Sequence, residues 1–208
     1  MDDVFGGIYR ANLWHGVESL SGPGSGTAAT RELVQALPAL VERLGVASVL
    51  DVGCGDGWWM PDLPGYMGID VADDPIRLAR DMHPGRLYGV VDLRDAPPPR
   101  FHLIIVRDVF QHLSWASGMA LLRNIRRSGS DWLLASTYAG TVNHDIPDGD
   151  YCEPDLTAPP YGLPEPTERL FDGYAYDGSG QRRDPRKFLG LWEPGSWSRP
   201  TNPAPGAG

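Results

Sequence analysis

The sequence predicts an α/β fold, in which helices cover both faces of a mostly parallel sheet. Short runs that are apolar throughout alternate with helical or loop segments along the chain. Such runs are typical of strands buried on both faces, and these occur mainly in parallel sheets. The 208 residues, of which 41% are hydrophobic, are enough for one domain with a sizeable core.

The elements are expected in the following order. Residues 1–26 are glycine-rich and form an irregular arm. A helix follows over 27–44, where leucines recur on one face and where Pro38 bends or interrupts the helix. Two further helices are expected at 74–82 and 115–127. Strands are expected at 48–53, 66–71, 87–91, 101–106, 132–137 and 187–194.

Residues 1–194 are expected to form a single domain. Within it, the segment 138–186 is rich in Pro, Gly, Asp and Tyr and lies between two expected strands. Long loops in compact domains are usually functional or disordered, and disordered chains contain few aromatic residues. We therefore expect 138–186 to form an ordered lid and the tail 195–208 to be disordered.

Charge and composition limit the partners. The formal net charge is −9 and the sequence pI is about 4.9, whereas a protein that binds nucleic acid needs a basic face. No run reaches the length of a membrane helix, and MDDVFGGIYR does not resemble a signal peptide. Cys54 and Cys152 make no disulfide framework. We expect a cytoplasmic protein that acts on a small neutral or cationic molecule, with no nucleic-acid or membrane partner.

A glycine-rich turn follows the first expected strand, in SVLDVGCGDGWW (residues 48–59). Such a turn between a strand and a helix lets the backbone approach a ligand at the carboxyl end of the strand. The dinucleotide fingerprint Gly-x-Gly-x-x-Gly would need its third glycine at position 58, where Trp58 stands. A dinucleotide oxidoreductase is therefore disfavoured.

The spacing Asp51-x-Gly53-x-Gly55-x-Gly57 resembles instead the first motif of the class I S-adenosylmethionine-dependent methyltransferases. The resemblance covers about residues 30–137. It implies a Rossmann-like, doubly wound sheet of seven strands, mostly parallel with an antiparallel last strand. It also implies that S-adenosylmethionine is the cofactor, that S-adenosylhomocysteine is the product, and that Asp51, Gly53 and Gly55 bind the cofactor.

Further positions match the motifs of this family in order. Asp70 ends the second strand in GIDV, where the family binds both ribose hydroxyls. Asp92, in VVDLRD, matches the acid that accepts a hydrogen bond from the adenine amino group, and Leu93 would donate its backbone N–H there. FHLIIVRDVFQHLS is similar to the fourth motif, which places Arg107 beside the methyl donor. Tyr9, in the arm, is expected to cover the tail of the cofactor.

The fourth motif also contains Asp108 and His112, which we expect to contact the acceptor together with Trp59 and Tyr151. Aromatic faces beside carboxylates suit a sugar, and they suit a planar aromatic acceptor almost as well. The arm IYRANLWHGVESLSGPGSG, with SGSDWLLASTY and FLGLWEP, resembles small bacterial sugar O-methyltransferases. Among these are actinobacterial enzymes that methylate the 1-hydroxyl of methylmannose polysaccharide precursors. The resemblance implies O-methylation of a sugar or oligosaccharide in polysaccharide biosynthesis.

A general base is expected, because a sugar hydroxyl is a weak nucleophile at neutral pH. His144 follows the fifth expected strand, and loops at the carboxyl ends of such strands face the cleft. Asp145 adjoins it, and Asp148 and Asp150 are close enough in sequence to orient or stabilise an imidazolium. His144 is therefore the expected base. His112 is the alternative, although a histidine near this position is often structural in the family.

A divalent cation that acidifies the hydroxyl is a further alternative. Its ligands would be Asp108, Asp145, Asp148, Asp150 and Glu153, but their spacing fits no defined metal loop. We therefore assign no metal site.

Other functions stay open at this stage. N-methylation of an amine-bearing metabolite or amino sugar would need no basic His144. A non-catalytic, cofactor-binding partner subunit would keep the cofactor acids without any activity. An RNA methyltransferase is disfavoured by the acidity of the chain, and an exposed apolar lid could support a homodimer.

Overall fold

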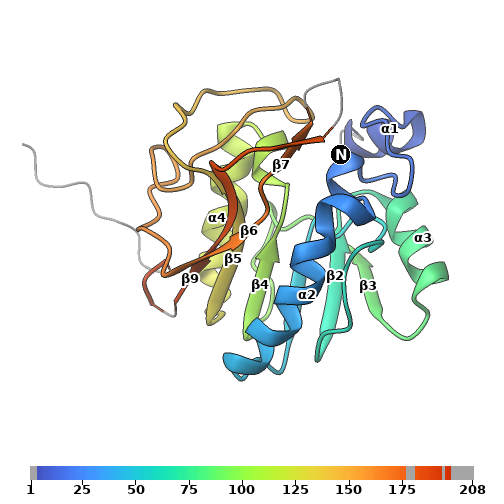
Figure 1. The fold of residues 1–208 in the computed structure, drawn as a ribbon, viewed down its shortest axis with the longest axis horizontal. Helices are drawn as coiled ribbons and strands as arrows, with labels where there is room; N and C mark the ends of the chain where they lie inside the picture. Colours follow the sequence, from blue (N-terminus) through green and yellow to red (C-terminus); the bar gives the residue numbers. More distant parts are fainter. Residues whose placement is uncertain (1–3, 177–180, 194, 198–208) are drawn as a thin grey trace, which may run out of the picture.

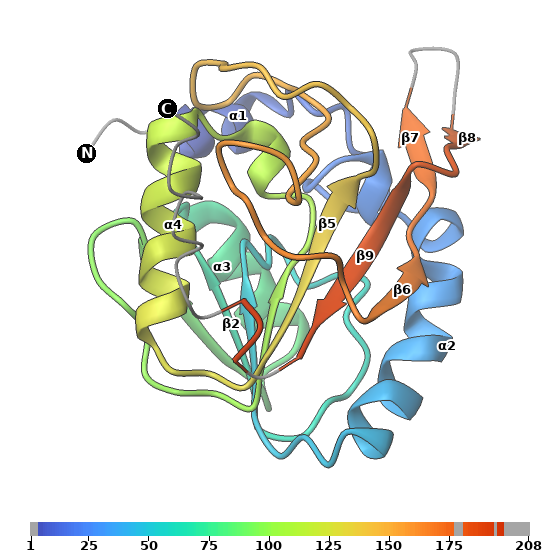
Figure 2. The same cartoon turned by 90° about the vertical axis from the view of Figure 1, so that its left-hand side faces the viewer.

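The computed structural model describes residues 4–176, 181–193 and 195–197 of the chain. Its main feature is a seven-stranded sheet with the strand order β3-β2-β1-β4-β5-β9-β6 (Figures 1 and 2). The strands of this sheet are β1 (Val49–Val52), β2 (Tyr66–Asp70), β3 (Leu87–Val90), β4 (Leu103–Val106), β5 (Trp132–Tyr138), β6 (Glu168–Phe171) and β9 (Lys187–Trp192).

The direction of the strands confirms the expected topology. The strands from β1 to β5 pair in parallel, whereas β9 is antiparallel to both β5 and β6. The strand order reverses between β1 and β4, because the chain leaves β1 for β2 on one side and β4 for β5 on the other. A ligand crevice forms at the carboxyl ends of the strands at such a switch point.

Helices cover both faces of the sheet. They are α1 (Val4–Ala11), α2 (Thr27–Arg43), α3 (Asp73–Met82) and α4 (Trp115–Arg127), with the short 3₁₀ helices η1 (Pro23–Ser25) and η2 (Phe110–His112). Successive residues of a strand point to opposite faces. Accordingly, Val49 joins one buried cluster with α2 and α3, and Leu50 joins a second cluster with α4. Figure 2 shows α2 and α4 on opposite sides of the sheet.

Three parts of the chain differ from the sequence expectation. The arm contains a helix, α1, and Pro38 lies inside α2 without ending it. The expected lid, 138–186, contains β6 and also β7 (Tyr174–Tyr176), which pairs with β8 (Gln181–Arg183). β6 reads Glu-Arg-Leu-Phe at the edge of the sheet, and a strand with one exposed face carries no continuous apolar run.

The start of the expected tail belongs to the fold. Trp197 is fully buried and its indole Nε1 donates to the carbonyl oxygen of Asp131 at 3.1 Å. Arg126 Nε donates in turn to the carbonyl oxygen of Trp197 at 2.8 Å. Residues 198–208 of that tail lie outside the described residues. Among the helices that are described, none has both the length and the apolar character needed to cross a membrane.

Candidate active site

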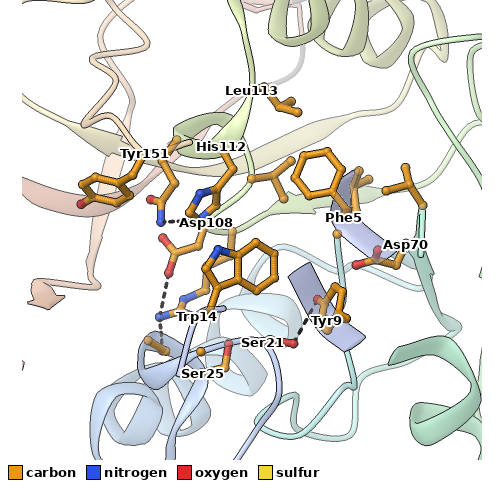
Figure 3. A pocket seen from close by; sticks show the side chains of 18 of the residues that line it. Phe5, Tyr9, Trp14, Ser21, Ser25, Asp70, Asp108, His112, Leu113 and Tyr151 are labelled. Atoms are coloured by element: carbon orange, nitrogen blue, oxygen red, sulfur yellow. Dashed lines mark hydrogen bonds and ion pairs between the residues drawn. The ribbon is translucent and has the colours of Figure 1, made fainter. Parts of the chain in front are cut away.

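A cavity of about 360 Å³ opens at the carboxyl ends of the strands near the switch point, within the size range of small-molecule sites. Residues from the arm, from the loops after β1 to β4, and from the segment after β5 line it. Figure 3 shows Asp70 and Phe5 at one end, His112 and Tyr151 at the other, and Tyr9 and Trp14 between them. The cavity therefore joins the strand ends that the sequence assigns to cofactor and acceptor.

One residue of the glycine turn, Gly53, lines the cavity together with Asp70. Gly53 has a φ of 71°, in the left-handed region that favours glycine. The Asp70 carboxylate accepts hydrogen bonds from the backbone N–H groups of Gly55 at 3.1 Å and Ala72 at 3.0 Å. Burial raises the pKa of Asp70 to about 6, against the lowering effect of these bonds. The carboxylate is thus held in place to accept hydroxyl donors.

Two residues of the glycine motif lie beneath the cavity and do not line it. Asp51 is buried under the turn, where Tyr66 Oη donates to its Oδ2 at 2.9 Å. Burial raises the pKa of Asp51 to about 7. Gly55 faces the arm, where a Cβ would overlap Ser21 Oγ. Both residues were expected to contact the cofactor. In the structure, Asp51 instead supports the turn and Gly55 allows the arm to pack closely against it.

Asp56, in the same turn, holds the arm against the cavity. Its carboxylate accepts from Ser19 Oγ at 2.8 Å and from the backbone N–H of Leu20 at 2.9 Å. Ser21 Oγ lies 3.3 Å from Tyr9 Oη, which links α1 to the same segment. Tyr9 is buried and lines the cavity, as expected for a residue that covers a ligand.

Asp92 and Leu93 line the cavity beyond the end of β3. Both carboxylate oxygens of Asp92 are engaged by Arg94, with Nε at 2.9 Å from Oδ1 and Nη2 at 2.7 Å from Oδ2. Burial acts to raise the pKa of Asp92, but the bonds to Arg94 prevail and hold it below its ordinary value. Arg94 also lines the cavity and was not predicted.

A group of buried charges surrounds the end of β4. Arg107 Nη2 donates to Asp172 Oδ1 at 2.8 Å and to the carbonyl oxygen of Gly24 at 2.9 Å. Lys187 Nζ lies 2.9 Å from Asp108 Oδ1. Burial would raise the pKa of Asp108, but the charges of Lys187 and Arg107 lower it well below its ordinary value. Asp108 is therefore ionised and paired, and a general base at this end must be another group.

His112 stands in that part of the cavity between two aromatic rings. Its ring centroid is 5.1 Å from that of Trp14 and 5.9 Å from that of Tyr151. Its Nδ1 lies 2.9 Å from the carbonyl oxygen of Asp150, and a carbonyl can only accept, so Nδ1 carries the proton. Burial lowers the pKa of His112, which keeps the ring neutral and leaves Nε2 as a lone-pair acceptor.

The structure brings most of the predicted site residues to the cavity, and four of them do not line it: Asp51 and Gly55, described above, with His144 and Trp59. Gly53, Asp70, Asp92, Leu93, Tyr9, Arg107, Asp108, His112 and Tyr151 line the cavity. His144 is exposed and does not line it. Trp59 also lies outside, where the Arg107 guanidinium stacks on its ring at 4.9 Å.

Sequence reasoning missed Trp14, Gln111, Tyr138 and Lys187, all of which line the cavity. A weak signal existed for Lys187, because it is the first residue of an apolar strand, and a lysine that is buried is nearly always paired with a carboxylate. No sequence signal pointed to Trp14, because its position depends on how the arm packs against the rest of the domain.

Asp145 and Asp148 anchor the start of α4. Asp145 Oδ1 accepts from the backbone N–H of Trp115 at 2.7 Å, and Asp148 Oδ1 accepts from that of Ser114 at 2.7 Å. Carboxylates commonly satisfy the free N–H groups at a helix start. Within the part of the chain that is described, no three His, Cys, Asp or Glu side chains gather closely enough to hold a metal ion.

Comparisons with known proteins place the fold. No protein-family model matches the chain, and no curated protein matches it significantly in sequence. Magnesium protoporphyrin IX methyltransferase (ChlM) from Synechocystis PCC 6803, solved with bound S-adenosylmethionine, superposes with a TM-score of 0.60 and 14% identity. The match covers 91% of this chain and 92% of that one.

Two other solved structures are similar. TehB from Haemophilus influenzae gives a TM-score of 0.56 at 16% identity over 77% of this chain, which spans only 62% of the TehB chain. A protein studied for the conversion of a disulfide bond into a thioacetal group during echinomycin biosynthesis gives 0.60 at 18% identity, over 95% of this chain and 92% of that one. At these identities the likeness is one of fold: the chain shares the mostly parallel, seven-stranded α/β sheet of solved methyltransferases such as ChlM.

Proposed function

We propose that the protein is an S-adenosylmethionine-dependent O-methyltransferase whose acceptor is a small neutral molecule, a sugar or oligosaccharide above all. One observation carries the proposal. A single cavity runs from Asp70 and Asp92, at the ends of β2 and β3, to the neutral imidazole of His112 beyond the end of β4. A methyl donor and a hydroxyl acceptor could meet inside it.

The residues of the cavity fit the donor along its length. The Asp70 carboxylate, fixed by two backbone N–H groups, suits the two ribose hydroxyls. Asp92 and the backbone of Leu93 suit the adenine edge. The backbone of 22–25, next to the start of α2, suits a carboxylate, because a helix N-terminus attracts anions. When bound, S-adenosylmethionine supplies an electrophilic methyl group on a positively charged sulfur.

His112 is the base that the geometry favours. Its Nε2 is unprotonated, and the ring lies between those of Trp14 and Tyr151. The side-chain amide nitrogen of Gln111 lies 3.4 Å from Nε2, and an acceptor hydroxyl would take its place. The acceptor oxygen would form its new bond to the methyl carbon while the hydroxyl proton passes to Nε2 and the electron pair of the broken bond stays on sulfur. His144 is the base expected from the sequence, but its side chain is exposed and does not line the cavity, which favours His112.

The class of acceptor is supported by the walls at the His112 end. Trp14 and Tyr151 offer apolar faces, and the hydroxyl of Tyr151 lies 3.2 Å from that of Tyr138. Arg107 and Lys187, two cations that line this end of the cavity, are paired with carboxylates, which favours a neutral acceptor. An apolar face with a polar rim suits a sugar, in keeping with the sequence resemblance to sugar O-methyltransferases.

The test is transfer of labelled methyl groups from S-adenosylmethionine to a panel of acceptors. The panel contains mannosides, partly methylated mannosides, amino sugars and catechols, each with wild type, His112→Ala and the matched variant His144→Ala. We expect label on a sugar hydroxyl, a loss of kcat of roughly 10²–10⁴-fold in His112→Ala, and nearly full activity in His144→Ala.

The contrary results separate the parts of the proposal. Label on an amine, with His112→Ala still active, would indicate N-methylation. Loss of activity in His144→Ala alone would return the role of base to His144. Binding of S-adenosylhomocysteine with no methylation of any acceptor would favour a cofactor-binding partner subunit.

A further inference from the structure

Arg94 bridges two carboxylates that come from distant parts of the chain. Its Nη2 and Nε bind Asp92 at the adenine end of the cavity, and its Nη1 lies 2.8 Å from Asp148 Oδ2 in the segment after β5. Asp92 is nearly buried, and the side chains of Arg94 and Asp148 are about a quarter exposed. Ion pairs of this kind are screened less than those on the open surface.

Asp148 belongs to a segment that is bound to the surroundings of His112. Asp148 Oδ1 accepts from the backbone N–H of Ser114, and Oδ2 accepts from Ser117 Oγ, both at 2.7 Å. The backbone N–H of Gly149 donates to the carbonyl oxygen of His112 at 2.8 Å. One residue further on, the carbonyl of Asp150 receives the Nδ1 proton of His112.

These contacts connect Arg94 to His112 through residues 148–150. Asp150 fixes the tautomer of His112, and the position of Asp150 depends on the anchor two residues earlier, Asp148. Arg94 therefore connects the adenine-end carboxylate to the group that orients the base.

A ligand at Asp92 would disturb this connection. Asp92 Oδ1 already accepts from the backbone N–H and from Nε of Arg94, both at 2.9 Å, and Oδ2 accepts from Nη2. An amino donor that reaches this carboxylate competes with these bonds and weakens them. Weaker bonds to Asp92 would leave the guanidinium more strongly bound to its other partner, Asp148. Coupling between sites needs such an element with two arrangements.

We propose that Arg94 is a positioning residue, which couples occupation of the adenine end of the cavity to the ordering of residues 148–152 and so to the orientation of His112. The inference rests on the proposed function, since it takes the adenine group to reach Asp92. It assigns to Arg94 and Asp148 a role in joining the two halves of the site, whereas contact with the acceptor is left to other residues.

Hydrogen exchange with S-adenosylhomocysteine as the probe tests the proposal without any acceptor. The backbone N–H groups of Gly149 and Cys152, which bond to the carbonyl oxygens of His112 and Gln111, report the order of the segment. In wild type, saturating probe is expected to slow their exchange about tenfold. In Arg94→Gln and Asp148→Asn, the probe should still bind and should slow exchange by less than about twofold.

Asp145→Asn is the matched control. Asp145 caps the same helix from the same segment, through the backbone N–H of Trp115, but it does not touch Arg94. Asp148→Asn keeps an oxygen for Ser114 and removes the charge that pairs with Arg94. Asp145→Asn should therefore keep the tenfold protection that wild type shows.

Each contrary outcome is distinct. Full protection in Arg94→Gln and Asp148→Asn, or an equal loss in Asp145→Asn, would overturn the role of Arg94 and leave the proposed function intact. The role of Arg94 would also be overturned if calorimetry showed that the probe binds wild type but hydrogen exchange were not slowed. Failure of wild type to bind S-adenosylhomocysteine would overturn both this inference and the proposed function.

Discussion

At the scale of single residues, the two acids at the ends of β1 and β2 show how position decides the use of a carboxylate. Asp70 lines the cavity and is held by two backbone N–H groups. Asp51, one strand away, points beneath the glycine turn to Tyr66. Both have raised pKa values because both are buried, but only Asp70 faces a space that a ligand could fill.

Asp51→Asn is expected to stabilise the protein at high pH. The pKa of Asp51 is about 7 in the folded protein and near 4 when unfolded, so its favourable contribution is complete below about pH 4 and lost as the pH rises through 7. Asn keeps the acceptor for Tyr66 and never ionises. Urea unfolding should show a gain over wild type at pH 8 of a few kcal/mol at most, since one pKa unit equals about 1.4 kcal/mol.

At pH 5 the gain from Asp51→Asn should be smaller, because wild-type Asp51 is then largely protonated. Calorimetry should find an unchanged affinity for S-adenosylhomocysteine. An identical pH dependence in variant and wild type would contradict this account of Asp51. A large loss of affinity would return Asp51 to the cofactor contacts.

At the scale of elements, the arm that carries α1 forms one wall of the cavity. Its fixed point is Asp56, which receives the hydroxyl of Ser19 and the N–H of Leu20. Within the arm, Asn12 and His15 adopt positive φ angles of 46° and 54°. Residues other than glycine hold such angles only where their surroundings enforce them.

Asp56→Ala is therefore expected to loosen the arm. Dissociation of S-adenosylhomocysteine, followed by stopped-flow fluorescence, should become roughly tenfold faster, because each lost hydrogen bond contributes about 1 kcal/mol. Glu18→Ala is the control, since Glu18 Oε2 accepts from the backbone N–H of Thr27 at 2.7 Å on the exposed side of the arm. Equal rates in wild type and Asp56→Ala would show that the arm does not gate release.

The elements also show what a sequence can predict and why. β1, β2, β4 and β5 were predicted because continuous apolar runs follow directly from burial on both faces of a sheet. β6 was not, because an edge strand with exposed Glu168 and Arg169 lacks that pattern. Motif spacing located Asp70 and Asp92, since each follows directly from a strand end.

The choice of general base, His144 or His112, could not be made from the sequence. His144 and His112 both follow strand ends, so sequence position does not separate them. The difference arises from tertiary contacts, because Asp148 and Gly149 tie the later segment back to residues 112–117 and leave His144 exposed. No local pattern encodes such a return of the chain.

At the scale of the whole molecule, buried charges join parts of the sheet that are far apart in the sequence. Arg107 and Asp108 follow β4, Asp172 follows β6 and Lys187 opens β9. Asp172 is fully buried, and Arg107 and Lys187 are nearly so. Removal of one partner from such a group leaves a charge without compensation.

Lys187→Met is expected to lower the free energy of unfolding by roughly 3–5 kcal/mol, because Asp108 loses its closest cation. Adding Asp108→Asn should recover part of this loss, and urea unfolding of the two single variants and the double variant measures the coupling. A loss below about 1 kcal/mol in Lys187→Met would mean that the group adds little to stability.

The arm has a consequence for how the protein is made. Trp14 and Ser19 are synthesised before their partners. The hydrogen bond from Ser19 to Asp56 and the ring contact of Trp14 with His112 therefore cannot form until Asp56 and His112 have left the ribosome. Contacts between residues so far apart in sequence form late, since the chain entropy lost in closing the loop comes before the gain. The site is therefore completed near the end of folding, and a nascent or truncated chain that lacks the later strands would have no closed cavity with which to capture a ligand.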